Sequence, residues 1–316
     1  MKNVAITDYG FEDLSLEKEI LDRYGLNLIC EKNPKKEELK RLTQYADYII
    51  TQFAKLDADI INNLKNAKII VRYGVGYDNV DIITARSKNI PVCNIPDYCI
   101  DEVADHTISF ILNSTRATYK NHKKVTQGEW GLGVPLNEMK SLNDLKIGII
   151  GYGRIGQAVV ERLIPFKPKI LISDPFYSNS VKNKELSFVE INDLLKNSDI
   201  ISLHCPSTEK TKNIINNHSL SLMKNGVSII NIGRGDLIDM GSFINYLQNK
   251  TIRSAALDVF DIEPLDKKHP IRDFDNVLFS SHIASASIKA AKKLRQSAAE
   301  LVIKCHKNET LTNIIN

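Results

Sequence analysis

The chain has 316 residues, of which 43% are hydrophobic and 25% are charged, the ordinary balance of a soluble globular protein. Its length predicts about two domains, and its net charge of +4, with acids and bases interspersed, argues against nucleic-acid or membrane-surface binding. We expect no membrane span and no secretion signal, because neither an apolar stretch of about 18 residues nor a signal-peptide pattern occurs. The five cysteines are scattered, which favours a reducing cytoplasm and predicts neither a disulfide framework nor a metal site.

The N-terminal hundred residues alternate short apolar runs with amphipathic segments. Such alternation predicts parallel strands joined by helices that cover both faces of a sheet. We expect strands at residues 4–7, 26–30, 48–51, 69–72 and 91–93, and helices that include residues 14–24 and 79–88.

A long helix is expected after Pro96, from Asp101 to Tyr119, with an extension to about residue 127 left open. Asp101 is a suitable N-cap for it. The loop that follows, residues 128–135, carries Trp130, the only tryptophan.

A second alternating series begins at Lys146 and is expected to form a six-stranded dinucleotide-binding sheet. A final helix is expected at residues 287–307. The six strands are expected at residues 146–150, 169–173, 199–204, 227–232, 254–258 and 276–279.

The clearest motif is Gly-x-Gly-x-x-Gly at Gly151, Gly153 and Gly156, between a strand and an expected helix at residues 157–163. Gly151 allows a tight turn, Gly153 lets the backbone approach a pyrophosphate, and Gly156 lets helix and strand pack closely. Asp174 ends the next strand, where a carboxylate accepts hydrogen bonds from the adenosine ribose and repels a 2′-phosphate. None of the next three residues is an arginine, so the motif predicts NAD rather than NADP. A glycine-rich turn of another βα protein, such as a methyltransferase, is the alternative.

Arg234, Glu263 and His282 each follow a different strand of this second series. Because the C-terminal ends of parallel strands line the ligand crevice, we expect these side chains to converge there. An arginine can bind a carboxylate through two hydrogen bonds, and a histidine can exchange a proton with a carbonyl or hydroxyl oxygen. A glutamate beside the histidine favours the imidazolium, and NAD would supply the hydride. Taken singly, each of the three has a purely structural alternative, and His106 and His204 are expected to be structural.

Together these motifs resemble the D-isomer-specific 2-hydroxyacid dehydrogenase family, which includes phosphoglycerate, glycerate/hydroxypyruvate, formate and phosphite dehydrogenases. The resemblance covers nearly the whole chain, and the run Pro-Asp-Tyr-Cys at residues 96–99 resembles a subgroup close to C-terminal-binding-protein-like dehydrogenases. The stretches that carry the resemblance are GVGYDNVD (74–81), VADHT (103–107), GYGRIG (151–156), LHCP (203–206), NIGRG (231–235) and ALDVF (256–260).

The resemblance implies an α/β fold with two Rossmann-like doubly wound domains. A flavodoxin-like, discontinuous substrate domain would comprise residues 1–99 and 287–316, and a Rossmann NAD-binding domain residues 100–286. Hinges near residues 99–101 and 284–287 would let the cleft close on substrate. A cytoplasmic homodimer through the long helix after Asp101 is implied, with Trp130 as an interface anchor.

The resemblance also assigns residues to roles. Arg234, Glu263 and His282 fall on the catalytic trio, and the backbone N–H groups of Val75 and Gly76 fall where the substrate carboxylate is held. Arg234 and Cys99 would also contact substrate, and Asp258 would hold the nicotinamide carboxamide. The implied cofactor contacts are Gly151, Gly153, Arg154, Ile155, Gly156, Asp174, Cys205, Pro206, Thr211, Ile232, Gly233, Asp258 and Thr107.

Three positions depart from the family's usual pattern. Cys99 replaces a common asparagine, Ser281 a proline and Ser285 a glycine, and Cys99 leaves the identity of the substrate open. The predicted reaction is hydride transfer between NAD and C2 of a D-2-hydroxy acid or 2-oxo acid. The alternatives are an NAD-sensing, protein-binding regulator of the C-terminal-binding-protein type and a phosphite-type dehydrogenase. Glu263 argues against a formate enzyme, since those carry glutamine there.

Overall fold

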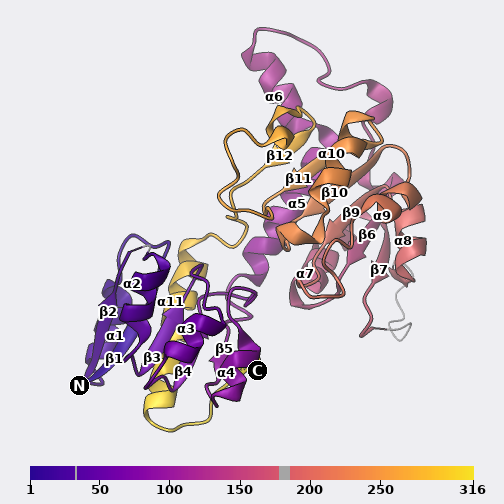
Figure 1. Ribbon diagram of the computed structural model, residues 1–316. Helices are drawn as coiled ribbons and strands as arrows, with labels where there is room; N and C mark the ends of the chain where they lie inside the picture. Colours follow the sequence, from indigo (N-terminus) through magenta and orange to yellow (C-terminus); the bar gives the residue numbers. More distant parts are fainter. Residues whose placement is uncertain (33, 178–185) are drawn as a thin grey trace. The chain divides into compact units, whose positions relative to one another are not determined.

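The computed structural model describes residues 1–32, 34–177 and 186–316. The chain folds into two compact units, one of Met1–Cys99 with Ala286–Asn316 and one of Ile100–Ser285. Each unit is built on its own parallel sheet (Figure 1), so the predicted α/β fold with two doubly wound sheets is confirmed. No helix in the described ranges is long and apolar enough to cross a bilayer.

The first unit contains a five-stranded sheet in the order β2-β1-β3-β4-β5. This is the flavodoxin-like strand order, which places a switch point between β1 and β3. Strands β3 and β4 are buried at every residue, which explains the apolar runs at residues 48–50 and 69–71. The strands are β1 Lys2–Ile6, β2 Leu26–Cys30, β3 Tyr48–Thr51, β4 Ile69–Arg72 and β5 Val92–Cys93.

The C-terminal segment returns to this first unit and completes it. Its helix α11 (Ile288–His306, yellow in Figure 1) packs Leu294, Ala298 and Val302 into the same buried cluster as the sheet. Ser287 caps this helix by accepting a hydrogen bond from Ala290 N at 2.9 Å. The other helices of the unit are α1 Ser15–Asp22, α2 Lys36–Thr43, α3 Ala58–Asn63 and α4 Ile82–Ser87.

The second unit contains a seven-stranded sheet in the order β12-β11-β10-β9-β6-β7-β8. This is the Rossmann strand order with one further strand at the β12 edge. Our expectation of six strands was wrong because Leu186–Phe188 forms β8, a strand too short to show a periodic pattern. The strands are β6 Lys146–Ile150, β7 Lys169–Ser173, β8 Leu186–Phe188, β9 Ile200–Leu203, β10 Val227–Asn231, β11 Ile252–Leu257 and β12 Val277–Phe279.

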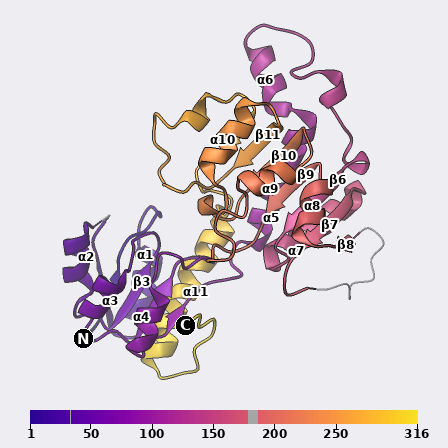
Figure 2. The same ribbon diagram turned by 45° about the vertical axis from the view of Figure 1, so that its right-hand side comes forward.

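The long helix of the second unit differs from the prediction at both ends. Helix α5 begins at Ile100, so Asp101 lies inside it and is not an N-cap. Asp101 instead accepts a hydrogen bond from Arg162 on α7, the helix that lies beside α5 (Figure 2), at 2.8 Å. The helix stops at Arg116 because Ala117 adopts a left-handed φ of 49°, and α6 then starts separately. The helices are α5 Ile100–Arg116, α6 Thr118–Thr126, α7 Arg154–Leu163, α8 Ile191–Asn197, α9 Asn217–Leu222 and α10 Met240–Gln248, with 3₁₀ turns at Leu136–Glu138, Leu142–Asp144, Ile164–Phe166, Gly235–Leu237 and Pro270–Asp273.

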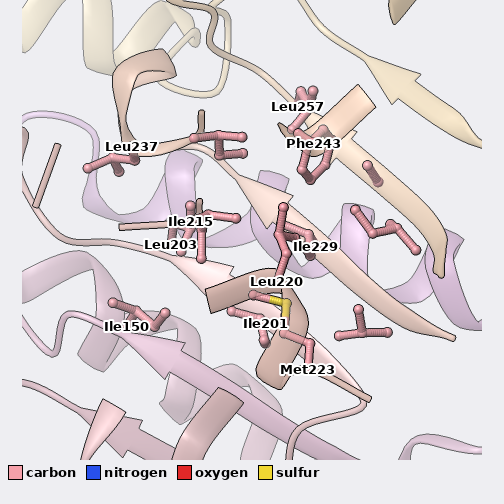
Figure 3. Close-up of a cluster of buried hydrophobic side chains, with 14 of the residues drawn as sticks. Ile150, Ile201, Leu203, Ile215, Leu220, Met223, Ile229, Leu237, Phe243 and Leu257 are labelled. Carbon is pink, nitrogen blue, oxygen red and sulfur yellow. The ribbon is translucent and has the colours of Figure 1, made fainter. Parts of the chain in front are cut away.

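One face of the seven-stranded sheet is covered by a dense apolar core. Ile201 and Ile229 point from neighbouring strands toward Leu220 and Phe243 of the covering helices (Figure 3). All four side chains are at most 1% exposed. Since well-packed interiors leave little freedom, this core fixes the strand ends from which the functional loops extend.

Candidate active site

The turn between β6 and α7 is shaped by its three glycines. Gly151 has a φ of +95°, and a Cβ there would lie 2.6 Å from the backbone nitrogen of Cys205. A Cβ on Gly156 would lie 2.3 Å from the carbonyl oxygen of Gly151. Gly153, by contrast, has no atom of the described residues within 4 Å of the position that a Cβ would take, and it precedes α7 as its N-cap without a side chain. The first N–H groups of α7 are therefore accessible to an anion such as a pyrophosphate.

Asp174 follows β7 beside this turn, and its carboxylate is held by the backbone. Oδ2 accepts a hydrogen bond from Tyr152 N at 2.7 Å, and Oδ1 accepts one from Phe176 N at 2.8 Å. A carboxylate offers about four acceptor sites, so this one retains capacity for two ribose hydroxyls. The open Gly153 position and the fixed carboxylate together fit an NAD molecule.

His282 and Glu263 form a hydrogen-bonded pair. His282 Nδ1 lies 2.6 Å from Glu263 Oε2, and each side chain is 31% exposed. Glu263 Oε1 also accepts a hydrogen bond from Phe260 N at 2.8 Å. Because a carboxylate accepts hydrogen bonds, Nδ1 of His282 carries a proton toward Glu263, and Nε2 is the ring nitrogen that would exchange a proton with a ligand.

The pKa of Glu263 reflects opposing influences. Burial raises it, whereas the hydrogen bond and charge of His282, the amide of Phe260 and the charge of Arg234 lower it. The lowering influences prevail, so the pKa lies below the ordinary value of 4.5. Glu263 is therefore a carboxylate throughout the neutral range and can stabilise an imidazolium at His282.

The backbone of His282 is unusual, because its φ is +57°. A residue with a Cβ pays about 1–2 kcal/mol for this left-handed conformation. Three hydrogen bonds to Asp258 offset that cost. His282 N donates to the Asp258 carbonyl at 2.7 Å, and Ile283 N and Ala284 N donate to its carboxylate at 2.9 and 3.0 Å.

Arg234 lies in a turn that contacts the loop of Glu263. The Asn231 side chain closes this turn, because its Nδ2 donates to Arg234 O at 2.7 Å and its Oδ1 accepts from Gly233 N at 3.0 Å. A Cβ on Gly235 would lie 1.8 Å from the carbonyl carbon of Phe260, so the two loops touch. The structure thus brings Arg234, Glu263 and His282 to the C-terminal edge of strands β10, β11 and β12.

In the first unit, Val75 and Gly76 lie in a loop that follows β4. Gly74 has a φ of +143°, and a Cβ there would lie 1.7 Å from Arg72 Nη1. The loop is fixed from the other side, because Asn94 Nδ2 donates to Val75 O at 2.6 Å. Val75 and Gly76 remain partly exposed, so their N–H groups are presented by a rigid loop.

A buried ion pair that the sequence did not suggest lies next to Tyr73, the residue before this loop. Arg295 of α11 binds both oxygens of Glu17, with Nε to Oε1 at 2.8 Å and Nη2 to Oε2 at 2.6 Å. Tyr73, which precedes the loop, donates its hydroxyl to the same Oε1 at 2.8 Å. Glu17 is completely buried, and its network ties β4 to the two ends of the chain.

The protein matches a known family over more than half its length. The sequence profile of the NAD-binding domain of D-isomer specific 2-hydroxyacid dehydrogenases matches residues 108–284. A glyoxylate reductase of Thermofilum pendens is 36% identical over 290 residues, which cover 90% of this chain and 85% of that protein. The chain belongs to the D-isomer specific 2-hydroxyacid dehydrogenase family.

Two further relatives agree with this membership. A D-3-phosphoglycerate dehydrogenase of Methanocaldococcus jannaschii is 32% identical over 323 residues, covering 100% of this chain and 60% of that protein. The solved D-lactate dehydrogenase of Aquifex aeolicus, complexed with NAD and lactic acid, superimposes with a TM-score of 0.89 at 27% identity, covering 97% of this chain and 96% of that one. The resemblance inferred from the motifs is confirmed, and the protein is an oxidoreductase that binds NAD.

Two of the side chains expected to contact NAD form hydrogen bonds inside the second unit of this dehydrogenase. Thr107 is completely buried, and its hydroxyl donates to Val103 O at 2.7 Å in its own helix. Thr211 donates to Pro206 O at 2.6 Å. Three other expected contacts are buried, with exposed fractions of 8% for Cys205, 8% for Ile232 and 1% for Asp258. Gly233 and Ile155 are partly exposed, and Pro206 and Arg154 are exposed. Their contacts with NAD stay predictions.

Cys99 is also buried, with 2% of its surface exposed, at the last residue of the first unit. It has the environment of a packed thiol, and its contact with substrate stays a prediction.

Sequence reasoning missed the hydrogen bonds that link His106 and Ser280 to Asp258, beside His282. His106 Nε2 lies 3.0 Å from Ser280 Oγ, although 174 residues separate the two in the chain. Ser280 Oγ in turn donates to Asp258 Oδ1 at 2.5 Å. No local pattern could reveal this arrangement, because each residue comes from a different element.

Proposed function

We propose that the protein catalyses reversible hydride transfer between NAD and C2 of a small D-2-hydroxy acid or its 2-oxo acid. The observation that carries this proposal is the His282–Glu263 pair, with a separation of 2.6 Å, on the sheet that also bears the dinucleotide turn. A histidine oriented by a carboxylate can exchange a proton with a substrate oxygen near neutral pH.

The glycine-rich turn and Asp174 would hold the pyrophosphate and the adenosine ribose of NAD. The carboxylate of Asp258 already accepts three hydrogen bonds, so about one acceptor site remains, which would accept the N–H of the nicotinamide carboxamide. When bound, NAD supplies or accepts the hydride.

His282 would then move the proton that balances the hydride. In reduction, protonated His282 donates from Nε2 to the carbonyl oxygen of the 2-oxo acid, and in oxidation neutral His282 accepts the hydroxyl proton. Arg234 and the N–H groups of Val75 and Gly76 would hold the carboxylate of the substrate. Orientation of the carboxylate by these groups would present C2 for transfer.

We propose that the two units have separate roles. Residues 1–99 and 287–316 would form the substrate domain, and residues 100–286 the NAD-binding domain. We also propose a cytoplasmic location, because all five cysteines are free thiols.

We propose a homodimer through α5 and the segment that follows it. Trp130, Leu132 and Leu136 are 89%, 50% and 72% exposed, and apolar side chains exposed together mark an interaction surface. Light scattering should give the mass of two chains, and Trp130→Glu should shift the population toward monomer. A monomeric wild-type protein would contradict the proposal.

The decisive assay is NADH oxidation with a panel of 2-oxo acids. Glyoxylate and phosphohydroxypyruvate belong in it, since a glyoxylate reductase and a phosphoglycerate dehydrogenase are relatives. We expect turnover with at least one acid, and a loss of about 10²–10⁴-fold in kcat for His282→Gln. Absence of turnover with every acid, by a protein that binds NADH, would refute the proposal and favour a regulatory role.

A further inference from the structure

A chain of three side chains links helix α5 to the loop that carries His282. His106 Nε2 lies 3.0 Å from Ser280 Oγ, and Ser280 Oγ lies 2.5 Å from Asp258 Oδ1. His106 belongs to α5, Asp258 follows β11 and Ser280 follows β12. Asp258 is only 1% exposed, so its carboxylate depends on these protein partners.

The direction of these hydrogen bonds follows from the number of protons. Asp258 acts as an acceptor, because Ile283 N and Ala284 N also donate to its carboxylate. Ser280 has one hydroxyl proton and uses it toward Asp258. The Ser280 oxygen can then only accept from His106, so Nε2 of His106 carries a hydrogen. That N–H exists in one neutral tautomer and also in the imidazolium.

The carboxylate at the end of this chain holds the backbone around His282. Its two oxygens accept from Ile283 N and Ala284 N, and the Asp258 carbonyl accepts from His282 N. His282 has a φ of +57°, a conformation that persists only where surrounding contacts enforce it. The placement of Asp258 therefore sets the placement of the His282 ring.

We propose that His106 is a positioning residue for His282, acting through Ser280 and Asp258. The inference rests on the proposed function, in which His282 exchanges a proton with the substrate. His106 supplies the N–H that engages the free lone pair of Ser280, which keeps the serine proton directed at Asp258. Without that donor, the Ser280 hydroxyl can rotate, and the loop of His282 loses its fixed anchor.

Two substitutions distinguish the effect of the His106 N–H donor from the effect of its aromatic ring. His106 packs edge-on against Phe110 with ring centroids 4.4 Å apart, so His106→Phe keeps an aromatic ring but removes the donor. His106→Gln keeps a side-chain N–H that can reach Ser280. For 2-oxo acid reduction we expect His106→Phe to lower kcat roughly tenfold, with the KM for NADH changed less than about twofold. His106→Gln should restore most of kcat.

A double-substitution cycle tests whether the two residues act in series. Ser280→Ala removes the link, so we expect His106→Phe/Ser280→Ala to be no slower than Ser280→Ala within about twofold. Losses that multiply, or equal losses for His106→Phe and His106→Gln, would overturn the proposal. Arg116→Gln, an exposed position on the same helix, is the matched control and should leave kcat unchanged.

A second readout does not depend on activity. Nitrogen-15 NMR of the histidine rings in the full chain reports which ring nitrogen of His106 is protonated. We expect a protonated Nε2 in wild type at every pH at which the protein is folded, and a changed environment in Ser280→Ala. An unprotonated Nε2 at neutral pH would overturn the hydrogen-bond chain even if the protein reduces 2-oxo acids. A protonated Nε2 in a protein without turnover would instead count against the proposed function alone.

Discussion

Glu263 is the residue whose charge matters most for the chemistry proposed at His282. Its carboxylate lies 2.6 Å from His282 Nδ1, and its pKa lies below 4.5 despite partial burial. Above that pH it remains ionised, so titration of Glu263 does not contribute to the activity profile in the neutral range.

Glu263→Gln should test this arrangement. The amide can still bond to the ring but lacks the charge, so we expect kcat for reduction to fall about tenfold or more. The pH at which reductive activity declines should also move lower, because the imidazolium is less stabilised. A pH–rate profile of wild type and variant measures both effects. An unchanged profile would show that Glu263 does not act on His282.

His204 offers a test of stability against pH. Its Nδ1 is buried and has no hydrogen-bond partner among the residues that the structure describes, and burial lowers its pKa from 6.5 to about 3. In the unfolded chain the His204 imidazole is therefore protonated near pH 6.5, whereas in the folded chain it is protonated only near pH 3. The stability contributed by neutral His204 is therefore fully present above pH 6.5. As the pH falls it is lost, and the free energy of unfolding is lower by about 2 kcal/mol at pH 5.

We expect His204→Gln to remove this part of the acid sensitivity. Urea unfolding at pH 7.5 and pH 5 should show a smaller loss of unfolding free energy for the variant than for wild type. His122→Gln, at an exposed position of α6, should behave like wild type. Equal losses in His204→Gln and wild type would contradict the account of His204.

At the scale of elements, the turn before α7 separates glycines needed for folding from a glycine needed for binding. Among the described residues, a Cβ on Gly153 would meet nothing within 4 Å, whereas one on Gly151 would lie 2.6 Å from the backbone of Cys205. Gly153→Ala should keep the melting temperature and weaken NADH binding at least tenfold, because a methyl group then faces the pyrophosphate. Gly151→Ala should lose about 2–4 kcal/mol of unfolding free energy. Calorimetric melting and NADH titration distinguish them, and tight NADH binding by Gly153→Ala would contradict the proposed phosphate site.

The ion pair between α1 and α11 gives a second prediction at this scale. Arg295→Met would leave the carboxylate of Glu17, which is completely buried, without its cation, so we expect a loss of about 3–5 kcal/mol. Lys293→Met is the matched control on α11. Its pair with Asp97 is exposed on both sides, so its loss should stay below about 1 kcal/mol. Urea unfolding compares the two, and equal losses would contradict a structural role for Glu17.

The sequence predicted those elements whose own residues determine them. Strands β2, β3, β4, β6 and β7 have the predicted bounds, because each is an apolar run between turns. The strand β8 was missed, since three residues carry no readable period. The start of α5 was misplaced, because the tertiary contact with Arg162 uses the carboxylate of Asp101 that we expected to cap the helix.

At the scale of the whole molecule, strand order explains how the trio could be predicted. Parallel strands end at one edge, so Arg234, Glu263 and His282 were expected to converge, and the structure brings them together. The His106–Ser280 and Glu17–Arg295 contacts could not be predicted, because they join elements 174 and 278 residues apart. Such contacts form only when helices and strands pack against one another, and a single sequence carries no local signal for this tertiary packing.

The most direct test of the proposed reaction follows the hydride and its stereochemistry together. The protein would be given its best 2-oxo acid among those that carry a carbon substituent on C2, so that reduction creates a stereocentre, together with NADH that carries two deuterium atoms at C4 of the nicotinamide. The account predicts a D-2-hydroxy acid with one deuterium at C2, as read by chiral chromatography and mass spectrometry. An L-hydroxy acid, or a product without deuterium at C2, would contradict it.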